Sequence, residues 1–382
     1  MLRCGAAGRL RRYPTRAVDP GITLTAMALP TDNLLELFRA IIDIESVSRN
    51  ERALADAIAQ TLEGLAHLEV IRDGDALLAR TRLGRPERVI IAGHLDTVPV
   101  AGNLPSSLGE GPQGIIVSGR GSCDMKGGIA VMVWLARSLA TPNRDIVWVF
   151  YDCEEIEANA NGLGRLLINQ PDWFSGADLA VVCEPTSAAI EGGCQGTIRV
   201  NIRCRGVAAH SARSWLGHNA IHDMAEVIER ARQFAAGPVV VDGLEYREGL
   251  NVTMISGGLA ANVIPDDCVA QINYRFAPDK SGEQALQILR DWFGKWELTV
   301  LDLSPGARPG LQLPTAEQFV TAVGRVPRPK YGWTDVARFS ALGVPAVNFG
   351  PGDPGMAHKV DECCPLADLE FCAAALRRWL SA

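Results

Sequence analysis

The chain has 382 residues, of which 47% are apolar and 21% charged, so it is long enough for two globular domains with their own cores. Its apolar runs fall short of the roughly 20 residues of a membrane-spanning helix, and its net charge of -7 disfavours a nucleic-acid-binding protein. Ten scattered cysteines without C-x-x-C spacing predict neither a zinc ribbon nor a disulfide framework, so we expect a cytoplasmic protein that binds neither membranes nor nucleic acids.

Residues 1–26 are predicted to be a disordered N-terminal extension. They contain five arginines but no apolar stretch before a small-residue cleavage site, so they do not fit a signal peptide. Met27 directly precedes the first helical pattern and is an alternative start of translation. A transit-like peptide is the second interpretation of this arginine-rich segment.

Residues 27–194 predict the first part of an α/β domain. Asp32 is suited to cap a helix whose apolar positions recur at helical spacing from Leu34 to Ile42, and a second helix is expected over 51–65. Short β-branched runs, separated by helical patterns such as 128–139, follow at 89–93, 146–150, 179–183 and 346–349. This alternation predicts a mostly parallel sheet with helices on both faces.

A different order of elements begins near residue 195. The patterns predict a strand, a helix, two strands, a helix and a strand, over residues 197–204, 220–234, 251–256, 268–276, 282–293 and 298–303. This β-α-β-β-α-β order is typical of a ferredoxin-like α+β domain. We therefore expect an inserted domain at 195–307, with residues 308–382 completing the α/β domain.

Polar residues follow the apolar runs directly, at the strand ends where open α/β sheets bind ligands. With two further loop positions the set is His94, Asp96, Asp124, Glu154, Glu155, Glu184 and His358. Imidazole and carboxylate are the ligands of catalytic zinc, and two ions roughly 3.5 to 4 Å apart can share one carboxylate. We assign His94 and Glu184 to one ion, Glu155 and His358 to the other, and Asp124 to the bridge.

The alternation of side chains along extended backbone separates two further roles. Asp96 lies on the same side as His94, where it can accept the second imidazole N–H and fix the tautomer. Glu154 points away from Glu155 and is free to act as general base. Taken singly, these residues also have structural interpretations, such as a solvated turn for the glutamates or a helix N-cap for Asp124.

These motifs resemble those of the M20 zinc peptidases and deacylases, from about Thr31 to the C-terminus. The matching segments are residues 93–99, 119–128, 152–155, 183–186 and the late His358. The resemblance implies the ligand, bridge and base assignments above, two zinc ions per subunit with cobalt or manganese as substitutes, and a homodimer formed through the inserted domain. It also implies that His210 enters the partner's active site and helps to hold the oxyanion. Capping of the following helix, or binding of a phosphate-like anion at the surface, is its alternative interpretation.

Within the family, the chain is most similar to the actinobacterial succinyl-diaminopimelate desuccinylases. The segments that carry this likeness are 193–197, 250–253, 262–265, 273–276 and 333–339. The likeness implies removal of succinate from N-succinyl-LL-2,6-diaminopimelate, with Glu154 taking a proton from the bridging water and later donating it to the leaving amine. Residues 330–334 depart from the better-known Gram-negative pattern.

The substrate-binding residues that this resemblance implies are Arg275, Arg338, Asn262, Thr334 and Gly332. The two arginines suit bidentate recognition of substrate carboxylates, and Asn262 is expected to reach the substrate across the dimer interface. A local ion pair for each arginine and a turn-shaping role for Asn262 are the structural alternatives.

Two alternative functions remain open. The same chemistry can act on another N-acyl amino acid or a small peptide, as in N-acetylornithine deacetylases, aminoacylases and dipeptidases. A non-catalytic binding protein on the same fold belongs to another class. Because such a protein is expected to have lost metal ligands, the complete ligand set favours an enzyme.

Overall fold

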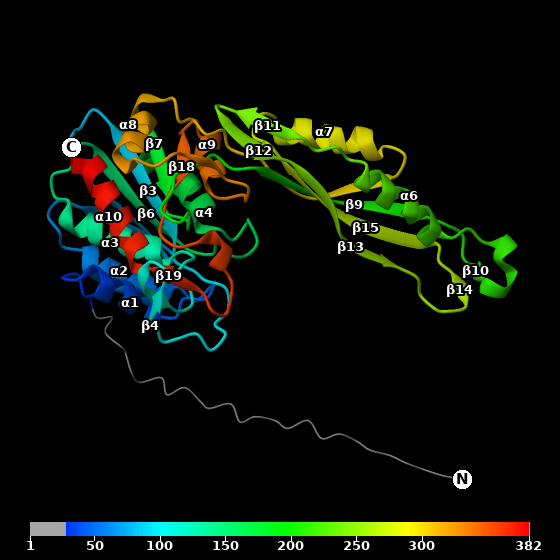
Figure 1. Cartoon of the computed structure of the whole chain (residues 1–382), viewed down its shortest axis with the longest axis horizontal. Helices are drawn as coiled ribbons and strands as arrows, with labels where there is room; N and C mark the ends of the chain where they lie inside the picture. Colours follow the sequence, from blue (N-terminus) through cyan, green and yellow to red (C-terminus); the bar gives the residue numbers. More distant parts are fainter. Residues whose placement is uncertain (1–27, 382) are drawn as a thin grey trace, which may run out of the picture.

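The computed structural model describes residues 28–381, so the predicted extension at residues 1–26 lies outside the described residues. Figure 1 shows that the chain forms two parts, each built on its own sheet, with the second part extending from one side of the first. Within residues 28–381, no helix is both long and apolar enough to cross a membrane.

The first part contains an eight-stranded sheet with the strand order β1-β2-β6-β3-β7-β18-β8-β17. Its strands are β1 (Glu69–Asp73), β2 (Ala76–Arg80), β3 (Arg88–His94), β6 (Asp145–Tyr151), β7 (Leu179–Val182), β8 (Glu191–Gly192), β17 (Arg328–Pro329) and β18 (Ala346–Asn348). The four central strands run parallel, as predicted, while β1, β2 and β8 pair antiparallel with a neighbour. The central strands are buried on both faces, which explains their continuous apolar runs.

Helices cover both faces of this sheet and enclose two separate cores. One core lies under α1 (Leu34–Asp43), α2 (Arg52–Leu62), α3 (Lys126–Ser138), α8 (Pro314–Val323) and α10 (Leu366–Ser381). The other lies under α4 (Gly162–Asn169), α5 (Pro171–Phe174) and α9 (Val336–Ala341). The prediction of helices on both faces is therefore confirmed.

Two predicted helix ends were wrong by a few residues. Helix α1 is capped by Asn33, whose side chain accepts a hydrogen bond from the Glu36 amide at 3.1 Å, and not by Asp32. Both residue types cap helices well, so the residue type alone does not distinguish between them. Helix α2 ends at Leu62 instead of Leu65, because Gly64 adopts a left-handed conformation with φ +79° just beyond it.

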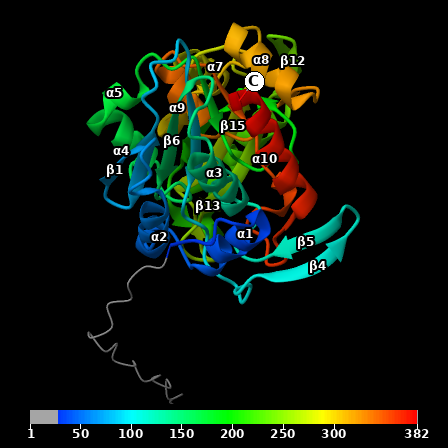
Figure 2. The ribbon, with the colours of Figure 1, turned by 90° about the vertical axis from the view of Figure 1, so that its left-hand side faces the viewer.

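A small sheet at the edge of the first part has the strand order β19-β5-β4. It consists of β4 (Ser107–Gly111), β5 (Gly114–Ser118) and β19 (Cys363–Pro365), and Figure 2 shows the β4-β5 hairpin projecting beside α1. Pairing of β19 with β5 brings the late loop that follows η2 (Pro354–Met356) against the loop that precedes α3. Two segments more than 230 residues apart in sequence thereby meet, as in the hydrogen bond from Cys123 to Glu362.

The second part has the ferredoxin-like arrangement that the sequence predicts. Its sheet contains β9 (Gly196–Arg205), β13 (Gly249–Gly257), β15 (Asp267–Phe276) and β16 (Glu297–Ser304), all antiparallel, in the order β13-β15-β9-β16. Helices α6 (Ala220–Arg232) and α7 (Gly282–Phe293) pack on one face. Residues of β9 and β15 alternate between buried and more exposed, so the opposite face of the sheet is polar and open.

Two small two-stranded sheets extend this second part. Strands β11 (Pro238–Val241) and β12 (Leu244–Arg247) form one of them. Strand β10 (Ala209–His210) pairs with β14 (Val263–Ile264) next to η1 (Ser211–Leu216), at the end of the second part that lies away from the main sheet (Figure 1).

Candidate metal centre

Three parallel strands deliver polar side chains to one edge of the main sheet. In the register of β3 and β6, His94 lies opposite Tyr151, so His94 and the Glu154-Glu155 pair emerge at the same level. Strand β7 ends two residues before Glu184 at that edge. The loop before α3 supplies Asp124, and the loop after η2 supplies His358.

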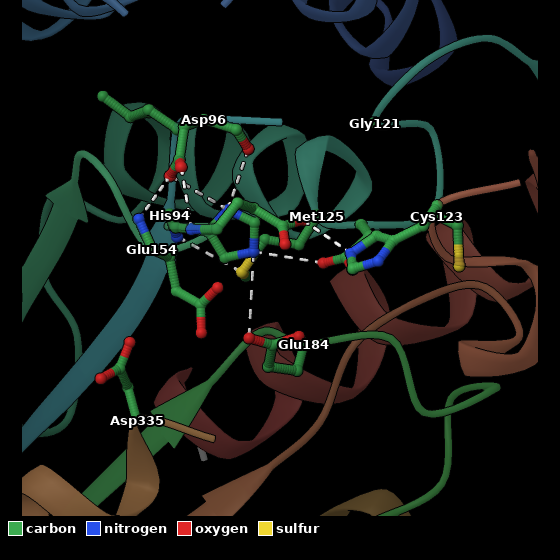
Figure 3. A network of polar contacts seen from close by, with 12 residues as sticks. His94, Asp96, Gly121, Cys123, Met125, Glu154, Glu184 and Asp335 are labelled. Atoms are coloured by element: carbon green, nitrogen blue, oxygen red, sulfur yellow. Dashed lines mark hydrogen bonds and ion pairs between the residues drawn. The ribbon is translucent and has the colours of Figure 1, made fainter. Parts of the chain in front are cut away.

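Five of the side chains selected from the sequence converge there. Asp124 lies between the two histidines, with Oδ1 at 3.1 Å from His94 Nε2 and Oδ2 at 3.3 Å from His358 Nε2. Glu184 Oε1 is 3.9 Å from His94 Nε2, and Glu155 Oε1 is 2.9 Å from His358 Nε2. The contacts therefore divide into two groups that share Asp124 (Figure 3 shows the His94 side).

The orientation of His94 differs in one respect from the expectation for Asp96. His94 Nδ1 lies 3.0 Å from the Asp96 carbonyl oxygen and 3.5 Å from its carboxylate, so the main-chain oxygen is the nearer acceptor. The Asp96 carboxylate accepts hydrogen bonds from the amides of Glu154 and Glu155, at 2.9 and 3.0 Å, and from the Ser48 hydroxyl. The Asp96 carboxylate thus lies on the same side as His94, as alternation predicts, and the main-chain oxygen of the same residue lies closer to Nδ1.

The ionisation of these groups reflects three carboxylates gathered around two histidines. Burial and the nearby Asp124 raise the pKa of Glu184 to about 7. Hydrogen bonds to Asp124 and Glu155 raise the pKa of His358 to about 10. Burial opposes protonation of His94, but contacts with Asp124 and Asp96 outweigh it and hold the His94 pKa well above its usual value. All three groups therefore bind a proton more readily than usual, as expected where negative charges outnumber positive ones.

The donor set fits a divalent cation. If His94 donates its Nδ1 proton to the Asp96 carbonyl, its Nε2 lone pair faces the Asp124 and Glu184 carboxylates. Such an arrangement is repulsive unless a proton or a cation lies between these atoms. Donor atoms of His94, Asp124 and Glu155 all lie within 4.8 Å of one another, close enough to share one ion.

Glu362 is a candidate site residue that the sequence did not indicate. Its buried carboxylate accepts hydrogen bonds from the amides of Gly121, Cys123 and Asp124, at 2.9 to 3.1 Å, and from Arg120 at 2.8 Å. It therefore fixes the loop that carries Asp124. The available signal was its position four residues after His358, in the same loop.

The backbone around the cluster is close-packed and locally unusual. Gly350 approaches the end of β7 so tightly that a Cβ atom would lie 2.5 Å from the Glu184 carbonyl oxygen. His358 and Cys153, which directly precedes Glu154, both have positive φ angles, +66° and +57°. Non-glycine residues in this conformation are costly and concentrate at functional sites. The peptide bond between Asp124 and Met125 is cis.

Glu154 is set apart from the five clustered side chains. Figure 3 shows its carboxylate on the side of Asp335. Burial, together with the charges of Asp335 and Glu184, raises the pKa of Glu154 well above its usual value. Glu154 also lines a pocket of about 600 Å³ between the two parts of the molecule, so a carboxylate that can hold a proton faces this pocket.

Three of the five predicted substrate-binding residues line the same pocket, namely Arg275, Arg338 and Gly332. Arg275 donates from Nε to Asn273 at 3.2 Å. Arg338 pairs with Asp335 at 2.6 Å, which matches the structural alternative of a local ion pair. Thr334 is buried, and its hydroxyl donates to Asn348 at 2.9 Å, so it supports the pocket from behind.

His210 and Asn262 do not join the cluster within one chain. They lie at the tip formed by β10, β14 and η1, where the Ser211 amide donates to the Asn262 carbonyl at 2.9 Å (Figure 1). His210 Nδ1 accepts from the Ala212 amide at 3.1 Å and caps η1, as its alternative interpretation has it. Both side chains are exposed, so the tip is free to contact another molecule.

Comparison with known proteins places this site in a family. A model of peptidase family M20/M25/M40 matches residues 90–382, which is most of the chain and includes all five clustered side chains. The chain belongs to peptidase family M20/M25/M40. This M20 protein is therefore a metal-dependent amidohydrolase.

Two relatives of this M20 protein have similar length. A Mycobacterium tuberculosis protein named "Putative succinyl-diaminopimelate desuccinylase DapE" is 52% identical over 349 residues, which cover 91% of this chain and 97% of the relative. The succinyl-diaminopimelate desuccinylase of Corynebacterium glutamicum is 44% identical over 356 residues, which cover 90% of this chain and 95% of the relative.

Solved structures share the M20 fold at low sequence identity. The aminopeptidase PepT of Bacillus cereus has a TM-score of 0.74 at 18% identity, covering 92% of this chain and 98% of its own. The Bacillus subtilis YXEP protein, described as a dinuclear metal binding peptidase from the M20 family, has a TM-score of 0.66 at 15% identity, covering 91% and 96%. These likenesses support the mixed α/β architecture with its mostly parallel main sheet.

Proposed function

We propose that the protein is a succinyl-diaminopimelate desuccinylase, which hydrolyses N-succinyl-LL-2,6-diaminopimelate to succinate and LL-2,6-diaminopimelate. The observation that carries the proposal is the convergence of five metal-competent side chains beside Glu154 and an arginine-lined pocket, in a chain 52% and 44% identical to proteins of that name. The substrate has three carboxylates, and guanidinium groups bind carboxylates by paired hydrogen bonds.

The assignment of metals follows the two contact groups. His94 and Glu184 would hold one zinc ion, Glu155 and His358 the second, and Asp124 would contribute one oxygen to each. Cobalt or manganese suits the same ligands. When bound, such ions lower the pKa of water and polarise the amide carbonyl. The dinuclear description of the YXEP protein supports two ions in place of one.

Glu154 is the proposed general base and acid. The main-chain amide of Glu154 donates a hydrogen bond of 2.9 Å to the Asp96 carboxylate, and the side-chain carboxylate of Glu154 faces the pocket. In that position Glu154 takes a proton from the attacking water and delivers it to the nitrogen that leaves when the amide bond breaks. Burial raises the pKa of Glu154, which suits a group that must hold a proton between these two steps.

We further propose that residues 195–307 form a dimerisation domain and that its tip completes the partner's active site. Val207, Trp215 and Leu216 near the tip are 56 to 77% exposed, which favours a partner surface. In a homodimer, His210 would help to hold the oxyanion and Asn262 would hydrogen-bond the substrate. Neither residue reaches the cluster of its own chain, so this role requires the second subunit.

The deciding experiment incubates the metal-loaded protein with N-succinyl-LL-2,6-diaminopimelate, N-acetylornithine and a dipeptide in parallel and measures amine release. We expect turnover of the succinyl substrate above all others and its loss after chelation. Exclusive preference for the acetyl substrate would replace the proposal with N-acetylornithine deacetylation. Equal rates with and without chelator, at background level on all substrates, would favour the non-catalytic alternative.

A further inference from the structure

The open face of the second sheet carries arginines into the pocket that Glu154 lines. Side chains alternate along a strand, so Thr197 and Arg199 of β9 lie on the face opposite the buried Ile198. Arg275 of β15 lies on the same face, since it pairs with Thr197 in the register of the two strands. Arg199, Arg275 and Glu154 all line the pocket of about 600 Å³.

Arg275 is held in place by a short chain of hydrogen bonds. Its Nε donates to Asn273 Oδ1 at 3.2 Å, and Asn273 Nδ2 donates to Thr197 Oγ1 at 2.9 Å. Its two terminal nitrogens have no hydrogen-bond partner within residues 28–381. Arg275 therefore presents the end of a fixed guanidinium group to the pocket.

Arg199 is a second positively charged residue on this face of the sheet, and no acidic side chain in the described part of the chain forms a close ion pair with it. Its nearest acid is Asp302 of β16, which lies opposite Arg199 in the register at an Nε–Oδ2 distance of 3.7 Å, too long for a hydrogen bond. Burial and the nearby positive charge of Arg199 lower the pKa of Arg275. Two guanidinium groups thus lie close together with one loosely placed carboxylate.

The other charged residues of the pocket wall already have close partners. Arg338 pairs with Asp335 at 2.6 Å, and Glu157 pairs with Arg49. Glu154 is assigned to proton transfer. The charge left over for a ligand is therefore positive, and it is concentrated on Arg199 and Arg275.

We propose that Arg199 is a further substrate-binding residue, which together with Arg275 forms a two-guanidinium site for a carboxylate of the substrate. This inference rests on the proposed function and deepens it. The carboxylate can come from the succinyl group or from the diaminopimelate portion, since both present the same planar acceptor. Two cations at one site suit a substrate that carries several carboxylates, whereas a neutral amide gains nothing from them.

The test compares two substitutions on the same strand and the same face. Arg199→Gln removes the proposed contact, whereas Arg203→Gln is the control, because Arg203 pairs with Asp267 and lies outside the pocket wall. Both side chains are partly exposed, so neither change is expected to prevent folding. Loss of a charge-assisted hydrogen bond should raise KM for the succinyl substrate roughly 10- to 100-fold in Arg199→Gln, with a smaller change in kcat.

Product binding gives a readout that does not depend on turnover. Isothermal titration of succinate and of diaminopimelate into each metal-loaded variant shows which product loses affinity, and this identifies the carboxylate that Arg199 binds. A loss for either product in Arg199→Gln alone supports the inference. Equal KM values and equal affinities in the two variants would overturn it. Failure of the wild-type protein to hydrolyse the succinyl substrate would instead contradict the proposed function.

Discussion

Candidate site residues are placed in two different ways in this molecule. One group lies at the rim of the main sheet, which is the edge that carries His94, Asp124, Glu155, Glu184 and His358, and the other lies at the tip of the second part. At the rim, His94, Asp124 and His358 contact one another within a single chain at 3.1 and 3.3 Å. At the tip, His210 and Asn262 lie beside each other on exposed backbone, away from any such cluster. The rim is assembled by folding, whereas the tip gains its proposed role only by assembly with a second subunit.

This difference has a physical basis in burial. The rim side chains are fixed by interior contacts, such as those of Glu362, and their placement costs no further ordering. The tip is held by the two residue pairs of β10 and β14, by the bridge between Val207 and His218 and by the hydrogen bond from Ser211 to Asn262, and its side chains remain largely exposed.

Removing the proposed base should affect the rim most. Glu154→Gln keeps the shape of the side chain but cannot take up a proton, so we expect kcat to fall roughly 10²- to 10⁴-fold while metal content is unchanged. Steady-state kinetics and metal analysis of the same preparation measure both quantities. Near-normal turnover would exclude Glu154 from proton transfer.

Substitution of His210 should abolish the proposed function of the tip and leave metal binding at the rim unchanged. His210→Ala is expected to lower kcat roughly 10²- to 10³-fold, as the loss of an oxyanion donor does, with no change in metal content. The control is His222→Ala, since His222 is exposed on α6 of the same part and has no proposed role. Equal kinetics in the two variants would contradict the role of His210.

Mixed dimers then decide whether the tip acts on the partner. A dimer of one His210→Ala subunit and one Glu154→Gln subunit has one complete site if His210 acts across the interface, so a random mixture should recover about a quarter of wild-type activity. Activity that stays at the level of the separate variants would mean that His210 does not act in the partner's site.

Loosening the loop of Asp124 should weaken the rim more mildly. Glu362→Gln replaces a carboxylate that accepts four hydrogen bonds by an amide whose NH₂ group must face donors. We expect metal affinity to fall roughly 10- to 100-fold, as for other groups that orient metal ligands. Competition with a chelator measures this, with the exposed Glu370→Gln on α10 as control. Unchanged affinity would show that the loop holds Asp124 without Glu362.

The smallest effect concerns the pH dependence of stability at the rim. Burial lowers the pKa of Lys126 to about 7, against 10.5 for an ordinary lysine. Between these values the unfolded chain binds the extra proton, so stability of the metal-free protein should rise with pH by up to about 1.4 kcal/mol per pH unit from this group. Urea unfolding from pH 7 to 9 should show a shallower slope in Lys126→Met. Parallel slopes would mean that Lys126 does not titrate there.

Much of the fold was predictable because its signals are local. The apolar runs of β3, β6 and β7 and the element order of the ferredoxin-like part are visible in the sequence, and the structure confirms both. Strands β4, β5 and β19 were not predicted, since they are at most five residues long and only β5 contains a run of three apolar residues. Exact helix ends, such as the choice of Asn33 over Asp32, depend on packing that the local sequence does not contain.

Residues of the candidate site were likewise predictable where their signal is local and were missed where it is not. His94 ends β3, and Glu155 and Glu184 come shortly after β6 and β7, so parallel topology alone predicts that they meet. Glu362 and Arg199 were missed for different reasons. Glu362 acts through main-chain amides of a loop 240 residues away, and Arg199 is one of several polar residues along an exposed strand face.

The sequence by itself determined the residue types, their positions after the strands and the order of the two folding units, because each depends on neighbours within a few residues. Only the tertiary structure decided which oxygen of Asp96 faces His94, which arginines of the pocket are already paired, and that His210 lies apart from the cluster of its own chain. These outcomes depend on distances between segments far apart in sequence, and such distances are set by the packing of the whole chain.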